Sequence, residues 1–298
     1  MRLVFFGTPS DAVPALRAVA ASHEVAFVVT QPDRRRGRGT TTSASPVKVA
    51  AQELGLEVRT PARATEVVDA VRTSNAELGV VVAFGQLLPD DLLHALARGF
   101  VNVHFSLLPR WRGAAPVERA ILAGDTETGV CIMALDAGLD TGPVYARRSS
   151  AIGPRETAGE LRARLVEIGT ELLVDTLPRI SEVIPEPQRG PALLAPKLTV
   201  EEFGLDWSHT ADELDRIVRA GNPRPGAWTT VGGERLKVMR AEPWSAPGRE
   251  PGAVDPHGVV TTGNGGLRLL EVQPEGRRAM TADAWLAGRH GEPTVLGR

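Results

Sequence analysis

The chain has 298 residues, of which 42% are hydrophobic and 23% charged, and its formal net charge at pH 7 is −2. This length favours two domains, and the composition is ordinary for a globular protein. The near-neutral charge argues against a protein that coats nucleic acid non-specifically, and no apolar run is long enough to cross a bilayer. The N-terminal MRLVFFGTP lacks the features of a signal peptide, so we expect a cytoplasmic protein.

Several structural and binding features are excluded by what the sequence lacks. The single cysteine, Cys131, excludes an internal disulfide and a metal site built from several cysteines. Because no cluster of Cys and His stands at metal-ligand spacing, we expect no metal. Neither GxxxxGK[ST] nor GxGxxG occurs, so a P-loop and a dinucleotide fingerprint are also excluded.

Short apolar runs alternate with amphipathic segments through the first part of the chain. In chain order, the pattern predicts a strand at 2–6, a helix at 10–22, a strand at 24–30, helices at 46–55 and 64–74, a strand at 78–84, a helix at 89–99, a strand at 100–106, a helix at 115–124, paired strands at 128–136 and 142–152, and a long helix at 156–177. This alternation is typical of an α/β domain with a doubly wound, mainly parallel sheet. Ligands on such sheets bind beyond the carboxyl ends of the strands.

The texture of the sequence changes near residue 185. The segment 185–198 is rich in proline and reads as a linker, and a short helix is expected at 210–221. Short strands with glycine turns follow at 226–233, 234–244, 258–266 and 267–276, which predicts a small barrel or sandwich. We therefore expect a catalytic domain over 1–184, a linker over 185–203 and a β-barrel domain over 204–298.

Three polar residues interrupt the apolar strand VNVHFS. A lone histidine in a strand is usually a core or surface residue, but alternation places Asn102, His104 and Ser106 on one face of this strand. Burying them without partners would be costly, so a site at the carboxyl edge of the sheet explains them better. Asp136 and Asp140 frame a glycine-rich turn, which alone would be an ordinary β-turn but offers the carboxylate that a working histidine needs.

Arginines gather in two loops that leave the same edge of the predicted sheet. Arg34, Arg35, Arg36 and Arg38 lie in QPDRRRGRGTTTSAS, and Arg110 and Arg112 follow the polar strand. Taken singly, each is an ordinary surface charge, but a basic loop beside a site suits a bulky anionic substrate. The residues themselves therefore indicate a two-domain α/β enzyme with an Asn/His/Asp site.

A set of motifs in fixed order resembles the 10-formyltetrahydrofolate-dependent formyltransferases, and in particular the branch that acts on methionyl-tRNA. The motifs include FGTP, TQPDRRRGRG, VVAFGQLLP, NVHFSLLPRWRGAAP, GLDTG, RAGNPRPGAW and LEVQPEGRRAM, and they run from residue 5 to about 280. The resemblance implies a Rossmann-like formyltransferase domain followed by an OB-like barrel that binds tRNA. One departure is that lysines common after RGRG are replaced here by TTTSAS.

The resemblance also implies roles for individual residues. Asn102, His104 and Asp140 match the catalytic trio, and Arg38 matches the arginine that contacts tRNA. Matching positions for the folate pocket are Phe84, Gly85, Gln86, Leu87, Leu88, Ser106, Leu107, Leu108, Pro109 and Asp136. Arg34, Arg35, Arg36, Arg38, Arg110 and Arg112 are the expected tRNA-binding residues.

The implied reaction transfers a formyl group from 10-formyltetrahydrofolate to the α-amino group of methionine on initiator methionyl-tRNA, as translation initiation requires. The expected partners are this tRNA and the folate co-substrate, with no metal and no membrane, and the expected state is a monomer. An alternative acceptor is an amino-sugar nucleotide. A non-catalytic nucleic-acid-binding protein is a third reading, which the low net charge and the complete trio disfavour.

Overall fold

The computed structural model describes residues 1–35, 42–245, 250–289 and 294–297. The chain divides into two compact units. The first comprises Met1–Gly113, Thr128–Ser150 and Ala163–Leu194, and the second comprises Ala114–Glu127, Ala151–Arg162 and Ala195–Arg298. The domain boundaries expected from the sequence, at residues 184 and 203, stay a prediction.

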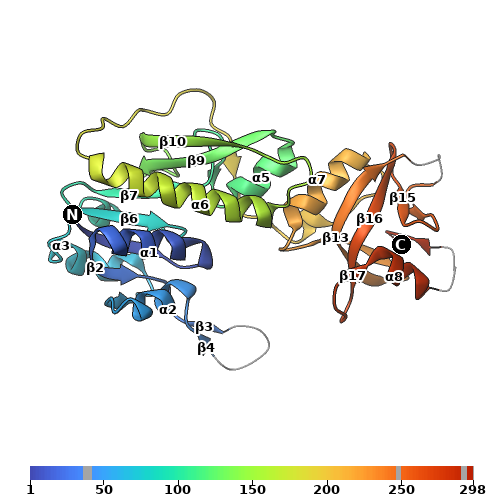
Figure 1. Ribbon diagram of the computed structural model, residues 1–298, viewed down its shortest axis with the longest axis horizontal. Helices are drawn as coiled ribbons and strands as arrows, with labels where there is room; N and C mark the ends of the chain where they lie inside the picture. Colours follow the sequence, from blue (N-terminus) through green and yellow to red (C-terminus); the bar gives the residue numbers. More distant parts are fainter. Residues whose placement is uncertain (36–41, 246–249, 290–293, 298) are drawn as a thin grey trace. The chain divides into compact units, whose positions relative to one another are not determined.

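A seven-stranded sheet in the order β10-β9-β7-β6-β1-β2-β5 organises the first unit (Figure 1). Its strands are β1 (Arg2–Gly7), β2 (Glu24–Val29), β5 (Val58–Arg59), β6 (Leu78–Val82), β7 (Phe100–His104), β9 (Glu127–Ala134) and β10 (Val144–Ala151). The pairs β1–β2, β1–β6, β2–β5 and β6–β7 are parallel, whereas β7–β9 is antiparallel. The predicted α/β class with a mainly parallel sheet is confirmed.

Helices cover both faces of this sheet. They are η1 (Ser10–Ala12), α1 (Val13–Ser22), α2 (Pro46–Glu53), η2 (Ala64–Val67), α3 (Val68–Arg72), α4 (Asp90–Leu93), α6 (Ala158–Thr176) and η3 (Leu177–Arg179). Phe6 and Val81 share a buried cluster with Val71 of α3 and Leu92 of α4. On the opposite face α6 lies so close to β7 that a Cβ added to Gly169 would stand 2.9 Å from Val103 Cγ1.

Two predicted helices are shorter than the sequence pattern suggested. The helix expected over 89–99 ends at Leu93, and the one expected over 64–74 is split into a 3-10 turn and the short α3. After α4, the Arg98 N–H donates to Glu77 O and Gly99 O accepts from Gly79 N–H. These backbone groups of residues 98 and 99 are hydrogen-bonded to the start of β6, so the chain cannot remain helical up to residue 99.

An antiparallel, barrel-like sheet forms the core of the second unit, in the order β12-β13-β16-β15-β14-β18 with β17 beside β16. The elements are α5 (Pro116–Ala123), η4 (Glu201–Phe203), α7 (Ala211–Gly221), β12 (Ala227–Val231), β13 (Glu234–Trp244), β14 (Ala253–Val254), β15 (Val259–Thr261), β16 (Gly266–Pro274), β17 (Met280–Thr281), α8 (Ala282–Ala287) and β18 (Thr294–Val295). Leu214 and Val218 of α7 and Trp285 of α8 pack on the buried face of this sheet. The predicted small barrel is confirmed.

Short strands complete the described secondary structure. They are β3 (Arg34–Arg35) and β4 (Thr42–Ser43), which pair with each other, and the two-residue strands β8 (Arg112–Gly113) and β11 (Leu194–Ala195). No helix among the described residues combines the length and the apolar character that a membrane span needs.

Candidate active site

Strand β7 presents Asn102 and His104 on one face. Val81 pairs with Asn102 on one side and Cys131 with His104 on the other, which fixes the register of the strand. Because side chains alternate along a strand, Asn102 and His104 point away from the face on which α6 covers Val103. Residues two apart in a strand have Cα atoms about 6.6 Å apart, so both side chains can reach one substrate.

The His104 imidazole is buried between two oxygen atoms. Only 5% of the residue is exposed, and its Nε2 lies 2.9 Å from the backbone oxygen of Trp111. Since a carbonyl oxygen only accepts hydrogen bonds, Nε2 is the nitrogen that carries a proton. On the other side, Nδ1 lies 3.6 Å from Asp140 Oδ2. Nδ1 therefore faces a carboxylate.

The motif GLDTG forms a tight turn whose residue types follow from its geometry. A Cβ on Gly138 would lie 1.9 Å from Thr141 Oγ1, and one on Gly142 would lie 1.9 Å from Ala134 O, so both positions need glycine. Asp140 has a φ of 50°, a left-handed conformation that aspartate tolerates better than most residues. Its Oδ2 accepts a 2.8 Å hydrogen bond from the Gly113 N–H.

The loop after β7 returns to the histidine that precedes it. Ser106 is fully buried, and its Oγ donates to Arg110 O at 2.7 Å. Trp111 adopts a φ of 65°, which is strained for a bulky side chain and turns its carbonyl oxygen toward His104. The backbone of this loop thus supplies a partner to His104 through Trp111 and a partner to Asp140 through Gly113.

Asn102 differs from His104 in having no hydrogen-bond partner for its side chain among the described residues. Its side chain is only partly buried, and within residues 1–35, 42–245, 250–289 and 294–297 its amide makes no hydrogen bond. Its two amide N–H groups are therefore available to a bound substrate, which is the property that a donor to a developing oxyanion needs.

Cys131, directly opposite His104 on β9, is not a candidate nucleophile. It is fully buried in a cluster with Leu108, Met133 and Val144. Burial raises the pKa of the Cys131 thiol above its ordinary value, so the reactive thiolate is disfavoured. The geometry of this site therefore excludes a covalent intermediate on Cys131.

The first segment expected to contact folate, residues 84–88, has mixed surroundings. The Phe84 ring is buried against Phe6 with ring centres 5.2 Å apart, and Phe84 O accepts from Gln31 Nε2 at 3.0 Å. Gly85 has a φ of 83°, and a Cβ there would lie 2.7 Å from that Nε2. Gln86 Oε1 accepts from a backbone N–H, Leu88 packs against the core, and Leu87 is 83% exposed.

The second such segment lies in the loop after β7 and in the aspartate turn. Leu108 is buried with Cys131, whereas Leu107 and Pro109, on either side of Leu108 in the sequence, are partly buried. Asp136 Oδ1 accepts from Thr141 Oγ1 at 2.6 Å and from the Gly138 N–H at 3.1 Å. Asp136 therefore stabilises the turn that presents Asp140.

The arginines expected to contact tRNA fall into two groups. Arg34 and Arg35 begin β3, whereas Arg36 and Arg38 lie outside the described residues. The Arg110 guanidinium stacks over the Trp111 ring at 4.7 Å. The Arg112 guanidinium donates hydrogen bonds to Gln188 Oε1. The positive charge of Arg112 therefore lies beside the loop that contacts His104.

Gln188 is a site residue that the sequence analysis missed. Its Nε2 donates to Asp140 O and to Gly142 O, both at 2.8 Å, and its Oε1 accepts from Arg112. A glutamine within a proline-rich stretch carries no local signal of this kind, because its partners lie more than 40 residues away in the sequence.

Comparisons with known proteins agree with this architecture. A family model described as "Formyl transferase" matches residues 1–177, and a model for the C-terminal domain of formyl transferases matches residues 197–290. The chain belongs to the formyl transferase family. The methionyl-tRNA formyltransferase of Thermus thermophilus is 49% identical over 305 residues, covering 100% of both chains. That of Jannaschia sp. is 47% identical over 302 residues, covering 99% of this chain and 100% of its own.

A solved structure has the same fold. The N-formyltransferase of Helicobacter canadensis, in complex with folinic acid and dTDP-3-aminofucose, superimposes with a TM-score of 0.67 and 16% identity. The match covers 91% of this chain and 98% of that one. Within the described parts of this formyl transferase, no group of three or more His, Cys, Asp and Glu side chains is arranged to hold a metal ion.

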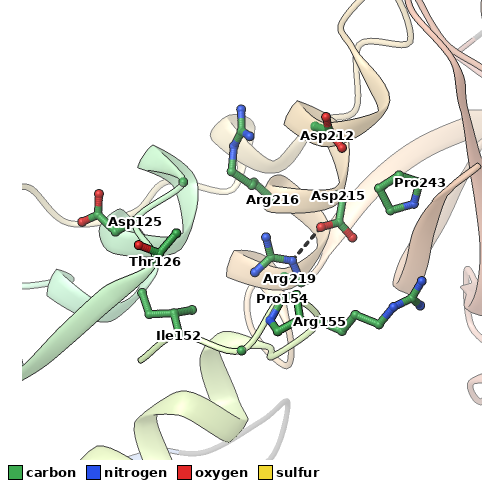
Figure 2. A pocket seen from close by; sticks show the side chains of 12 residues that line it. Asp125, Thr126, Ile152, Pro154, Arg155, Asp212, Asp215, Arg216, Arg219 and Pro243 are labelled. Carbon is green, nitrogen blue, oxygen red and sulfur yellow. Dashed lines mark hydrogen bonds and ion pairs between the residues drawn. The ribbon is translucent and has the colours of Figure 1, made fainter. Parts of the chain in front are cut away.

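A separate cavity of about 510 Å³ lies within the second unit (Figure 2). Three aspartates and three arginines line it, so these groups carry no net charge together. The Arg219 Nε donates to Asp215 Oδ2 at 2.7 Å, and both side chains are mostly buried. Burial raises the pKa of the Asp215 carboxyl, and the neighbouring Arg219 opposes that rise. The pair links neighbouring turns of α7.

We predict that Arg219→Ala lowers the free energy of unfolding by about 3–5 kcal/mol at pH 7, because it removes the guanidinium that pairs with the buried Asp215 carboxylate. Urea denaturation measures this loss. Because a raised folded-state pKa favours the fold at low pH, the loss should shrink as the pH falls toward 4. Adding Asp215→Asn should restore part of the stability, and a double variant as unstable as Arg219→Ala alone would contradict this account.

Proposed function

We propose that this formyl transferase moves a formyl group from 10-formyltetrahydrofolate to the α-amino group of methionine on initiator methionyl-tRNA. The product, formylmethionyl-tRNA, serves translation initiation. The observation that supports this most strongly is the end-to-end match, at 47% and 49% identity, to methionyl-tRNA formyltransferases. The folinic acid bound to the N-formyltransferase of Helicobacter canadensis, which has the same fold, supports a folate as the formyl donor.

The reaction requires one new C–N bond and the loss of another. The neutral methionyl amine attacks the formyl carbon, and the formyl oxygen becomes an oxyanion. Asn102 donates an amide N–H to that oxyanion, a role supported by the absence of any hydrogen bond to its amide from the described residues. Collapse of the tetrahedral centre breaks the bond to the folate nitrogen, and the proton lost by the amine must reach that nitrogen.

His104 and Asp140 are the groups that move this proton. Nε2 is committed to the Trp111 carbonyl, so Nδ1 is the nitrogen that accepts the proton from the amine. Asp140 Oδ2, 3.6 Å away, stabilises the imidazolium ion that forms. The imidazolium then returns the proton to the leaving folate nitrogen, which restores the neutral ring. No net proton is gained or lost by the protein.

Substituting each member of the trio tests this mechanism. We predict that Asn102→Ala lowers kcat by about 10²–10³-fold, as loss of an oxyanion donor does. His104→Ala and Asp140→Ala should lower it by about 10²–10⁴-fold through loss of proton transfer. The measurement is formylation of methionyl initiator tRNA, with circular dichroism to show that each variant folds. Near-full turnover by His104→Ala would show that the assigned site is wrong.

The basic loop that contains Arg38 is proposed to bind the tRNA. We predict that Arg38→Ala lowers kcat/KM for methionyl-tRNA while leaving the affinity for folate unchanged, because the arginine is proposed to pair with tRNA phosphates and not with the folate. Arg63→Ala is the matched control, since Arg63 is an arginine of the first unit whose side chain is 84% exposed. An equal loss of folate affinity in Arg38→Ala would remove the tRNA role from this loop.

A further inference from the structure

The segment that follows the first unit's last helices lies along the aspartate turn. We define residues 186–193 as the strap. Val144 and Glu186 exchange two backbone hydrogen bonds, of 2.8 and 2.9 Å, just after the turn. At the other end of the strap, Leu193 O accepts from the Arg112 N–H at 2.8 Å and the Leu193 N–H donates to Pro109 O at 3.3 Å. The strap is thus bound both to β10 and to the loop that encloses His104.

Gln188 lies between these two attachments, and both ends of its side-chain amide are hydrogen-bonded. Its Nε2 donates to Asp140 O and Gly142 O at 2.8 Å each, and its Oε1 accepts from Arg112 Nε at 3.0 Å and from a terminal Arg112 nitrogen at 2.7 Å. An arginine has only donors, and carbonyl oxygens only accept, so these partners fix which end of the amide points to which. Glutamate cannot reproduce this pattern because it has no N–H groups.

Hydrogen bonds hold both the backbone and the side chain of Asp140, and both depend on the loop after β7. Gln188, fixed by Arg112, holds the Asp140 carbonyl, and the next residue, Gly113, donates to Asp140 Oδ2 at 2.8 Å. These contacts matter because the turn is poorly packed: residues 136–139 are exposed, and Leu139 is 52% exposed. Asp140 also adopts a φ of 50°, which local sequence alone would not maintain.

We infer that Gln188 is a positioning residue for catalysis: it locks the turn in the conformation that places the Asp140 carboxylate beside His104 Nδ1. This inference rests on the proposed function of that pair. The strap is therefore part of the active site's supporting structure and not only a connection to the second unit.

The first test compares Gln188→Ala and Gln188→Glu with the wild-type enzyme in formylation of methionyl initiator tRNA. Groups that orient a catalytic residue typically contribute about 10–100-fold, and we expect kcat to fall by this factor in both variants. KM for tRNA and for folate should change by less than about threefold, because Gln188 itself is not among the residues expected to contact either substrate. Gln52→Ala, an exposed glutamine on α2, is the matched control and should keep full activity.

A double-mutant cycle separates positioning from a general structural role. If Gln188 acts through Asp140, Gln188→Ala should cost at least fivefold less in an Asp140→Ala background than in the wild type. The same loss in both backgrounds, or a single variant with at least half the wild-type kcat, would overturn the inference while leaving the proposed function intact.

Hydrogen exchange provides a readout that does not depend on turnover. Gln188→Ala should increase amide exchange at the Gly113 N–H and across residues 138–142, with no change in β1 or β2. If the wild-type enzyme formylated no acceptor, the proposed function would fail, and this increase would still show that Gln188 holds the turn. Unchanged exchange in these residues would overturn the inference.

Discussion

The rest of the site depends on one interaction, the placement of the buried His104 imidazole between the Trp111 carbonyl oxygen and the Asp140 carboxylate. Burying an imidazole is unfavourable unless its nitrogens find partners. One partner must leave Nε2 protonated, and the other must stabilise charge on Nδ1. A carbonyl and a carboxylate meet these two demands, and the chain bends through two left-handed residues, Trp111 and Asp140, to bring them there.

Four segments, the first two of them consecutive in the sequence, build the site around this ring. Strand β7 contributes Asn102 and His104, the following loop contributes backbone groups, the GLDTG turn contributes the carboxylate, and the strap contributes Gln188. The sheet supplies a rigid base for the first segment only. The turn and the loop hold each other through hydrogen bonds rather than through apolar packing, so small losses in this network should affect rate more than stability.

The sequence predicted those features that have a local or periodic signature. Apolar periodicity identified the parallel sheet and the small barrel, and alternation along β7 placed Asn102 and His104 on one face. It could not predict where α4 ends, because that depends on hydrogen bonds from residues 98 and 99 to the edge of β6. The role of Gln188 could not be predicted either, because its hydrogen-bond partners also lie far from it in the sequence. Arg112 was expected to bind tRNA on the basis of its charge, whereas in the structure its guanidinium meets an amide from the strap.

Formylation of methionine on initiator tRNA is the reaction proposed for this site. The most direct test is a single-turnover reaction with 10-formyltetrahydrofolate in which methionyl initiator tRNA, methionyl elongator tRNA and an amino-sugar nucleotide are offered in parallel. We expect fast formylation of the initiator tRNA and little reaction with the other two. Turnover of the sugar nucleotide with charged tRNA left untouched would contradict it, while keeping the Asn102, His104 and Asp140 site.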